Sequence, residues 1–170
     1  EAKNIAGEEI TRRLLVKPKA CFGCRIACGR ETRLDSVVGE GPEYETVYAL
    51  GSCCLLWNLE TIWRANHLCN DLGLDTISTG VTIACAMELS EKGLTPEKVR
   101  WGDGDKIIEL IEKIAYRNGF GNDLAEGSRR LSEKYGDPDA AMHVKGLELP
   151  AYDPRGAKGQ GLAYATSNRG

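Results

Sequence analysis

The clearest pattern along the chain is a run of apolar residues at helical spacing over residues 103–117. The residues at i, i+3, i+4 and i+7 are Ile107, Leu110, Ile111 and Ile114. Acidic residues lead this segment and Gly119 follows it, as is usual at the two ends of a helix. The pattern therefore predicts an amphipathic helix that turns one face toward a core.

The same period predicts two neighbouring helices over residues 59–72 and 75–93. Gly73 stands between them, where it supplies a left-handed C-cap to the first helix while Asp75 caps the second. These two helices and the turn that joins them are expected to form the middle of the domain.

Two further helices are predicted at segments with weaker patterns. One begins with Pro42 in its first turn, carries an apolar stripe that includes Val47, and fades near residues 57–58. The other spans residues 122–135, with Glu126 placed for a capping box.

The remaining segments have little helical pattern. Residues 1–20 are charged and weakly patterned, and residues 30–40 read as extended, with room for one short strand pair. Residues 146–161 are rich in Gly and Pro, which indicates an ordered loop or a domain boundary. The predicted fold class is mainly α, an irregular helical domain with a cysteine-rich loop.

Composition narrows the class of protein. A chain of 170 residues with 42% hydrophobic and 28% charged residues is typical of a soluble globular domain with a core. No apolar stretch approaches the roughly 20 residues of a membrane span. The polar residues 1–9 do not resemble a signal peptide. The net charge of −3, without a basic run, argues against nucleic acid as a partner.

The candidate chemistry lies in the cysteines. Cys21, Cys24 and Cys28 have C-x2-C-x3-C spacing within eight residues of a set of seven cysteines. Soft thiolates this close together suit an iron–sulfur centre, and a cubane cluster requires a fourth cysteine from elsewhere. An odd number of cysteines also favours a reducing compartment such as the cytoplasm over a disulfide framework.

Two other interpretations of this cysteine segment stay open. The three thiols would share one buried face if the segment were a helix, although Gly23 and Gly29 disfavour a regular helix. A zinc site normally needs a second ligand pair, and the chain has only two histidines, His67 and His143, far apart in sequence.

Two polar segments also have both a structural and a functional interpretation. The stretch from Asn70 to Asp75 needs no role beyond capping two helices, but its polar groups can also meet the edge of a planar ligand. Glu43 and Glu45 suit the positive end of a solvated helix. In a dry pocket, a carboxyl at this position can instead transfer a proton.

Taken together, four motifs resemble the tungsten-containing aldehyde ferredoxin oxidoreductase family over nearly the whole chain. Each motif is weak alone, but their order is specific. They are Cys21-Phe22-Gly23-Cys24 with Cys28-Gly29-Arg30, the segment Glu40-Gly41-Pro42-Glu43-Tyr44-Glu45-Thr46, the segment Asn70-Asp71-Leu72-Gly73-Leu74-Asp75-Thr76-Ile77-Ser78-Thr79-Gly80, and Gly146-Leu147-Glu148-Leu149-Pro150-Ala151-Tyr152-Asp153-Pro154-Arg155-Gly156.

The resemblance implies a tungsten or molybdenum ion held by two pyranopterins, beside a [4Fe-4S] cluster that passes electrons to ferredoxin. The implied reaction converts a small aldehyde and water into a carboxylic acid. It makes Cys21, Cys24 and Cys28 cluster ligands, and Glu45 the carboxylate near tungsten that moves a proton. The implied pterin contacts are Asn70, Gly73, Leu74 and Asp75.

The chain departs from the family pattern at three positions. Asn70 replaces an aspartate of the pterin motif, which keeps an acceptor but removes its charge. Arg25 stands where proline is usual, between the second and third cysteines. Arg64 replaces a glutamate that in some members belongs to a metal site between subunits, so no such metal is predicted, although a homodimer is left open.

By the same resemblance, residues 1–149 correspond to the second, helical domain of the family and residues 150–170 to the truncated start of the third. The fourth cluster ligand and the second pterin motif would then lie outside this sequence, and the chain alone is expected to be inactive. Three alternatives remain: an aromatic acyl-CoA reductase on the same scaffold, an iron–sulfur electron-transfer module, and a structural zinc domain.

Overall fold

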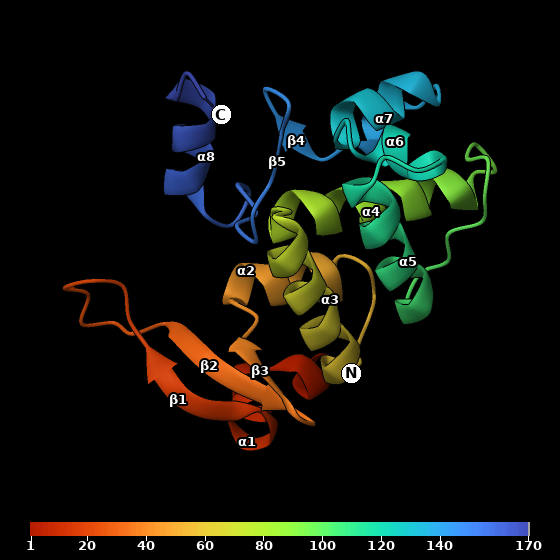
Figure 1. The fold of residues 1–170 in the computed structure, drawn as a ribbon. Coiled ribbons are helices and arrows are strands. Elements are labelled where there is room, and N and C mark those ends of the chain that lie inside the picture. The colour runs from red at the N-terminus through yellow and green to blue at the C-terminus, as the bar shows by residue number, and fades with distance from the viewer. Residues whose placement is uncertain (170) are drawn as a thin grey trace.

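The computed structural model describes residues 1–169, and about half of them are helical. A body of packed helices carries a small antiparallel sheet on one side (Figure 1). The elements in chain order are η1 (Ala2–Ile5), α1 (Gly7–Arg13), β1 (Leu15–Lys19), β2 (Gly29–Leu34), β3 (Val37–Glu40), α2 (Tyr44–Thr46), the π-helical η2 (Val47–Ser52), α3 (Leu59–Leu72), α4 (Thr76–Glu91), α5 (Gly104–Ala115), α6 (Phe120–Leu124), α7 (Ser128–Lys134), η3 (Pro138–Ala140), β4 (His143–Val144), β5 (Leu147–Glu148) and α8 (Lys158–Thr166). The mainly α class is confirmed. The predicted domain boundary between residues 149 and 150 stays a prediction. Gly170, the last residue of the second predicted domain, lies outside the described residues.

Helices α3, α4 and α5 confirm the three strongest predictions, and capping side chains begin each of them. Asn58 Oδ1 accepts from the Thr61 N–H at 2.9 Å, Asp75 Oδ2 from Ser78 at 2.7 Å and Asp103 Oδ1 from Lys106 at 3.0 Å. Gly73 ends α3 with φ of 69°, the left-handed conformation expected of it.

Helix α4 lies at the centre of the body, and nearly every residue from Thr79 to Leu89 is buried. Gly80 lets α4 approach η2 closely, because a Cβ there would lie 2.5 Å from the backbone carbonyl carbon of Ala49. No single helix in residues 1–169 is long and apolar enough to cross a membrane. α3 and α4 meet that test of length and composition only as a pair, bent by 119°.

Two helix predictions were wrong in their extent. The helix expected over 42–57 begins only at Tyr44, continues as the π-helical η2 and ends at Ser52. The helix expected over 122–135 is broken into α6 and α7 by Gly127, whose φ of 85° leaves the helical region. Glu126 forms ion pairs with Arg117 and Arg130 instead of a capping box.

The sheet has three antiparallel strands in the order β1-β2-β3. The strand pair expected within residues 30–40 is confirmed as β2 and β3, whereas β1 was not predicted. The sequence pattern did not predict β1 because this strand carries lysines and is mostly exposed, so it lacks a clear apolar alternation. Its Pro18 is tolerated because β1 is an edge strand. Thr32 of the central strand is buried and accepts a 2.7 Å hydrogen bond from the indole of Trp63 on α3. This bond fixes the sheet against the helical body.

The Gly- and Pro-rich segment of residues 146–161 is partly regular. It contributes β5, which pairs with β4 in a short hairpin, and it runs into α8, which the sequence pattern did not reveal. The intervening loop of residues 149–156 returns to the start of α2, as the contacts below show.

Candidate functional site

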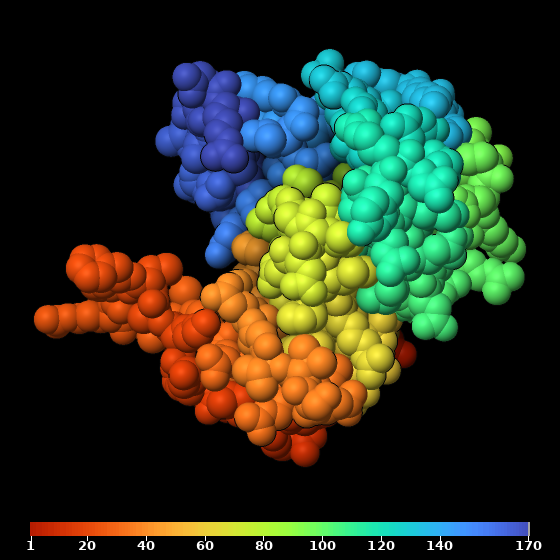
Figure 2. Space-filling view, viewed as in Figure 1, coloured from red at the N-terminus to blue at the C-terminus, as the bar shows by residue number. Residues whose placement is uncertain are grey.

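Residues 20–28 form an irregular loop between β1 and β2 that extends away from the body (Figures 1 and 2). Its turn is closed by a 3.0 Å hydrogen bond from the Cys24 N–H to the Cys21 carbonyl, and Gly23 and Ala27 have φ of 72° and 51°. These conformations are incompatible with a helix, so the interpretation of the cysteines as one face of a buried helix was wrong.

Cys21, Cys24 and Cys28 are all exposed on this loop, and none of them forms a disulfide. Across residues 1–169, no group of three or more His, Cys, Asp or Glu side chains is gathered closely enough to hold a metal ion. The three thiols suit an iron–sulfur cluster by donor type and sequence spacing. In this structure they do not form a preformed cage.

Of the four cysteines predicted as core residues within helices, Cys54, Cys69 and Cys85 lie in the core, although Cys54 is in the turn after η2, whereas Cys53 in the same turn lines a cleft. Cys54, Cys69 and Cys85 are buried, and burial raises the pKa of the Cys69 and Cys85 thiols to about 12. Cys53 is half-buried, and its pKa is also raised by burial. A raised pKa disfavours the thiolate that metals and oxidants require, so these groups are poor ligands.

Glu45 lies in the first turn of α2 and is half-buried, whereas Glu43 before it is exposed. Glu45 Oε2 accepts a 2.8 Å hydrogen bond from the backbone N–H of Ala151. Glu45 Oε1 is buried and has no hydrogen-bond partner among residues 1–169. An unpaired buried carboxylate oxygen costs free energy, so its presence favours a functional site over a solvated helix end.

A cleft of about 660 Å³ borders this contact. Its walls come from η2, from α4 and from the loop of residues 149–155, and most of the lining side chains are apolar. The lining residues include Tyr48, Cys53, Val81, Ala151 and Tyr152, and Ala151 is the one that bonds to Glu45. Burial is the main cause that raises the pKa of Tyr48 above its usual range, so this phenol stays protonated.

The turn from Asn70 to Asp75 has the local structure that capping alone requires. The Gly73 and Leu74 N–H groups bond to the carbonyls of Asn70 and Cys69 at 3.2 and 2.8 Å. The predicted contacts of Asn70, Gly73, Leu74 and Asp75 with a pterin remain predictions.

The fold brings three of the four motifs together around α2. The Thr46 and Thr76 hydroxyls lie 2.8 Å apart, which joins the residue after Glu45 to the residue after Asp75. Ala151 approaches Glu45 from the fourth motif. The base of the cysteine loop is also close, because a Cβ on Gly29 would lie 3.5 Å from the carboxylate of Glu43.

Sequence reasoning missed the Ala151 N–H and the hydroxyl partners of Glu148. The Glu45–Ala151 pair is separated by 106 positions, so no local periodicity reports it. The one available signal was the Gly- and Pro-rich stretch around Ala151, which marked an ordered loop without indicating what the loop contacts.

The family described as "Aldehyde ferredoxin oxidoreductase, domains 2 & 3" matches residues 1–170. The chain is 54% identical over 173 residues to a tungsten-containing aldehyde ferredoxin oxidoreductase of Pyrococcus furiosus, covering 97% of this chain and 29% of that protein. The protein of the same description from Thermococcus kodakarensis is 52% identical over 173 residues, with the same coverage of 97% and 29%.

More distant relatives carry other names. An "aliphatic sulfonate oxidoreductase, WOR-like subunit" of Pyrococcus furiosus is 30% identical over 169 residues, covering 89% of this chain and 27% of that protein. Among solved structures, the active-site complex BamBC of benzoyl coenzyme A reductase with 1,5-dienoyl-CoA matches with a TM-score of 0.76 at 22% identity, covering 95% of this chain and 26% of that one. This last likeness shows a shared fold. The chain thus spans less than a third of the length of each of these relatives.

Proposed function

The chain belongs to the aldehyde ferredoxin oxidoreductase family, and on that basis we propose that it serves in a cytoplasmic enzyme that oxidises a small aldehyde to a carboxylic acid. The reaction consumes one aldehyde and one water, and it releases the acid, two protons and two electrons. Ferredoxin is the proposed acceptor of those electrons.

The observation that carries this proposal is the state of Glu45. One of its oxygens is held by the Ala151 N–H, and the other is buried without a partner among the described residues. Ala151 itself lines a largely apolar cleft. A carboxylate held in this way can accept a proton from water or from an aldehyde hydrate, and the apolar walls limit access by other water.

The residues that would hold the cofactors come from two of the four motifs. Cys21, Cys24 and Cys28 would supply three sulfurs to a [4Fe-4S] cluster, with a fourth ligand from outside this sequence. Asn70, Gly73, Leu74 and Asp75 would contact a pyranopterin. When bound, the tungsten–pterin group supplies the two-electron oxidation and the cluster supplies the one-electron path to ferredoxin.

The test uses the complete enzyme prepared without oxygen. Iron, sulfide and tungsten analysis with EPR is expected to give about four irons of one cluster, and aldehyde is expected to reduce a viologen dye. Glu45→Gln is expected to lower kcat by at least about a hundredfold, in line with the loss of a general base, while the metal content stays unchanged. Cys24→Ser is expected to lower the iron content.

Other outcomes would overturn the proposal. Zinc without iron would make the cysteine loop structural. A cluster without tungsten or aldehyde oxidation would leave an electron-transfer module. Reduction of an aromatic acyl-CoA without aldehyde oxidation would favour the reductase alternative, whose observed support is the shared fold with the benzoyl coenzyme A reductase complex.

A further inference from the structure

Glu148 is a second carboxylate near the proposed site, and it faces away from the cleft into the helical body. Its Oε1 accepts hydrogen bonds from the Ser128 N–H and the Ser128 hydroxyl, both at 2.8 Å, and from the Thr82 hydroxyl at 3.5 Å. Ser128 is fully buried at the start of α7, and Thr82 is 2% exposed within α4. One carboxylate oxygen thus joins β5 to two helices of the core.

The backbone beside these helices is shaped to admit this oxygen. Gly127 has φ of 85°, and a Cβ on it would lie 3.1 Å from Glu148 Oε1. Only glycine combines this conformation with so close an approach at little cost. The contact is therefore a specific feature of the packing between β5 and α7.

Three residues further along the chain, Ala151 donates its N–H to Glu45 Oε2 at 2.8 Å. The segment between Glu148 and Ala151 is short and contains Pro150, whose ring restricts the backbone. The backbone N–H of Tyr152 donates a 2.7 Å hydrogen bond to the Pro150 carbonyl, which tightens the same turn. The two carboxylates therefore hold the two ends of one stiff segment.

We infer that Glu148 is a positioning residue for Glu45: by fixing residues 149–151 to α4 and α7, it keeps the Ala151 N–H on Glu45 Oε2 and so limits rotation of the carboxylate that carries the unpaired Oε1. This inference rests on the proposed function of Glu45 as proton acceptor. Without the Glu148 contact, the segment can move away from Glu45, and the Glu45 carboxylate gains rotational freedom. A displacement of about 1 Å at a catalytic group can lower a rate about a hundredfold.

The test compares variants of the complete holoenzyme by kinetics and by hydrogen exchange of the peptide that contains Ala151. Pro150 and Pro154 have no N–H, so few amides report on this segment and that of Ala151 can be resolved. Glu148→Ala is expected to speed exchange at Ala151 by about tenfold or more and to lower kcat about ten- to a hundredfold, with KM changed less than about threefold. Tungsten and iron contents should stay unchanged.

Two further variants separate positioning from general damage. Glu148→Gln keeps an oxygen acceptor for Ser128, so it is expected to restore kcat to within about threefold of the native enzyme. Glu133→Ala is the matched control, because Glu133 is an exposed carboxylate on α7 that pairs only with Arg129 at 2.9 Å among the described contacts. It should change neither kcat nor exchange at Ala151.

The inference fails if Glu148→Ala leaves exchange at Ala151 and kcat unchanged, or if it changes KM in proportion to kcat. Should Glu148→Ala not fold, Ser128→Ala removes one of the three donors and keeps the backbone N–H. It must then speed exchange at Ala151, and unchanged exchange contradicts the inference. Glu45→Gln distinguishes the two levels: full activity in that variant would overturn the proposed function itself, whereas an inactive Glu45→Gln with a native-like Glu148→Ala overturns only the positioning role.

Discussion

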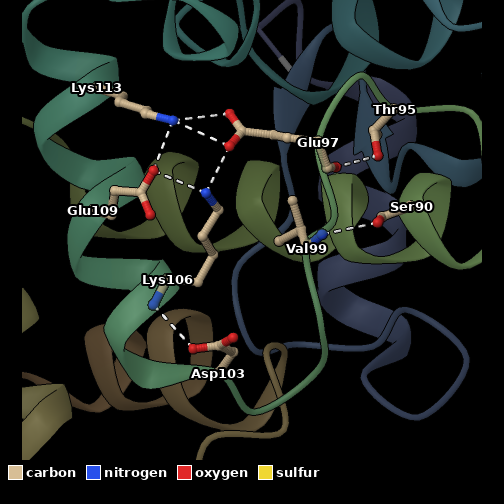
Figure 3. Close-up of polar contacts among 8 residues, drawn as sticks. All are labelled: Ser90, Thr95, Glu97, Val99, Asp103, Lys106, Glu109 and Lys113. Carbon is tan, nitrogen blue, oxygen red and sulfur yellow. Dashed lines mark hydrogen bonds and ion pairs between the residues drawn. The ribbon is translucent and has the colours of Figure 1, made fainter.

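The helical body and the cysteine loop differ in how far their polar groups are paired and their apolar side chains are buried. In the body, Glu97 receives hydrogen bonds from Lys106 at 2.6 Å and from Lys113 at 3.0 Å, and both lysines also contact Glu109 (Figure 3). In the loop, Phe22 and Ile26 are 109% and 82% exposed, and the only backbone hydrogen bond within residues 20–28 is that between Cys24 and Cys21.

This difference indicates where each region obtains its order. The body buries a contiguous apolar core and pairs many of its surface charges, so packing holds it. The loop carries three exposed thiols and two exposed apolar side chains, and these groups do not take part in that packing. Its conformation is therefore expected to depend on what the thiols bind.

The largest expected difference between the two regions is the reactivity of their cysteines. In cluster-free protein at pH 8, an alkylating reagent should modify Cys21, Cys24 and Cys28 at least about a hundredfold faster than the buried cysteines, because reaction requires access and thiolate. At that pH, a thiol whose pKa is raised to about 12, as for Cys69 and Cys85, is about one part in ten thousand thiolate.

Mass spectrometry of digested protein measures this difference site by site. Labelling in denaturant, where all seven cysteines must react, is the control for reagent access. Equal rates in the folded protein would mean that the body exposes its cysteines as readily as the loop does. The proposed difference in order between the two regions would then be wrong.

A smaller effect is expected from filling a close contact inside the body. A Cβ on Gly121 would lie 2.2 Å from the backbone carbonyl of Lys113, where α6 packs on the end of α5. Gly121→Ala is therefore expected to lower the free energy of unfolding by about 1–3 kcal/mol. Gly159 of α8 has open space around it, and Gly159→Ala is expected to raise stability by about 0.5–1 kcal/mol.

Urea unfolding followed by circular dichroism measures both changes. The pair sharpens the comparison because both substitutions add one methyl group to a helix and differ only in the packing around it. If Gly121→Ala were as stable as Gly159→Ala, the contact between α5 and α6 would be looser than the structure indicates.

The sequence predicted the body because its order is local. The period of α5 and the caps at Gly73 and Asp75 act within one or two turns, so the boundaries of α3 and α4 followed directly. Where local signals conflicted, prediction failed. Gly127 breaks the helix expected over residues 122–135, and the glycines of α8 concealed a helix.

The site was predictable only in part, because its contacts are long-range. Spacing alone located the cysteine loop, and the motif around Glu45 marked a candidate carboxylate. The partner of that carboxylate is a backbone N–H, which every non-proline residue carries, so its sequence contains no distinguishing signal. Likewise, the apolar pattern does not reveal that Ser128 and Thr82 meet Glu148.

The smallest effect is expected from the ion-pair network of the body. Burial alone would raise the pKa of Glu97, but the hydrogen bonds from Lys106 and Lys113 outweigh it and lower that pKa. Because the pKa is lower in the folded state, the network stabilises above the ordinary value of 4.5 and loses this contribution as the pH falls through the folded pKa. Since these groups are partly exposed, Glu97→Gln is expected to cost only about 0.5–1 kcal/mol at pH 7.

Urea unfolding of native protein and Glu97→Gln at several pH values and salt concentrations measures this cost. The difference should shrink below about pH 4.5, where the unfolded carboxyl is protonated, and it should also shrink in about 1 M salt. Glu112 is an exposed carboxylate on α5, the helix that carries Lys106 and Lys113, and Glu112→Gln should stay within about 0.5 kcal/mol of the native protein. A pH-independent cost for Glu97→Gln would mean that the side chain stabilises by packing, so the body would owe its order to burial alone and its contrast with the loop would not be electrostatic.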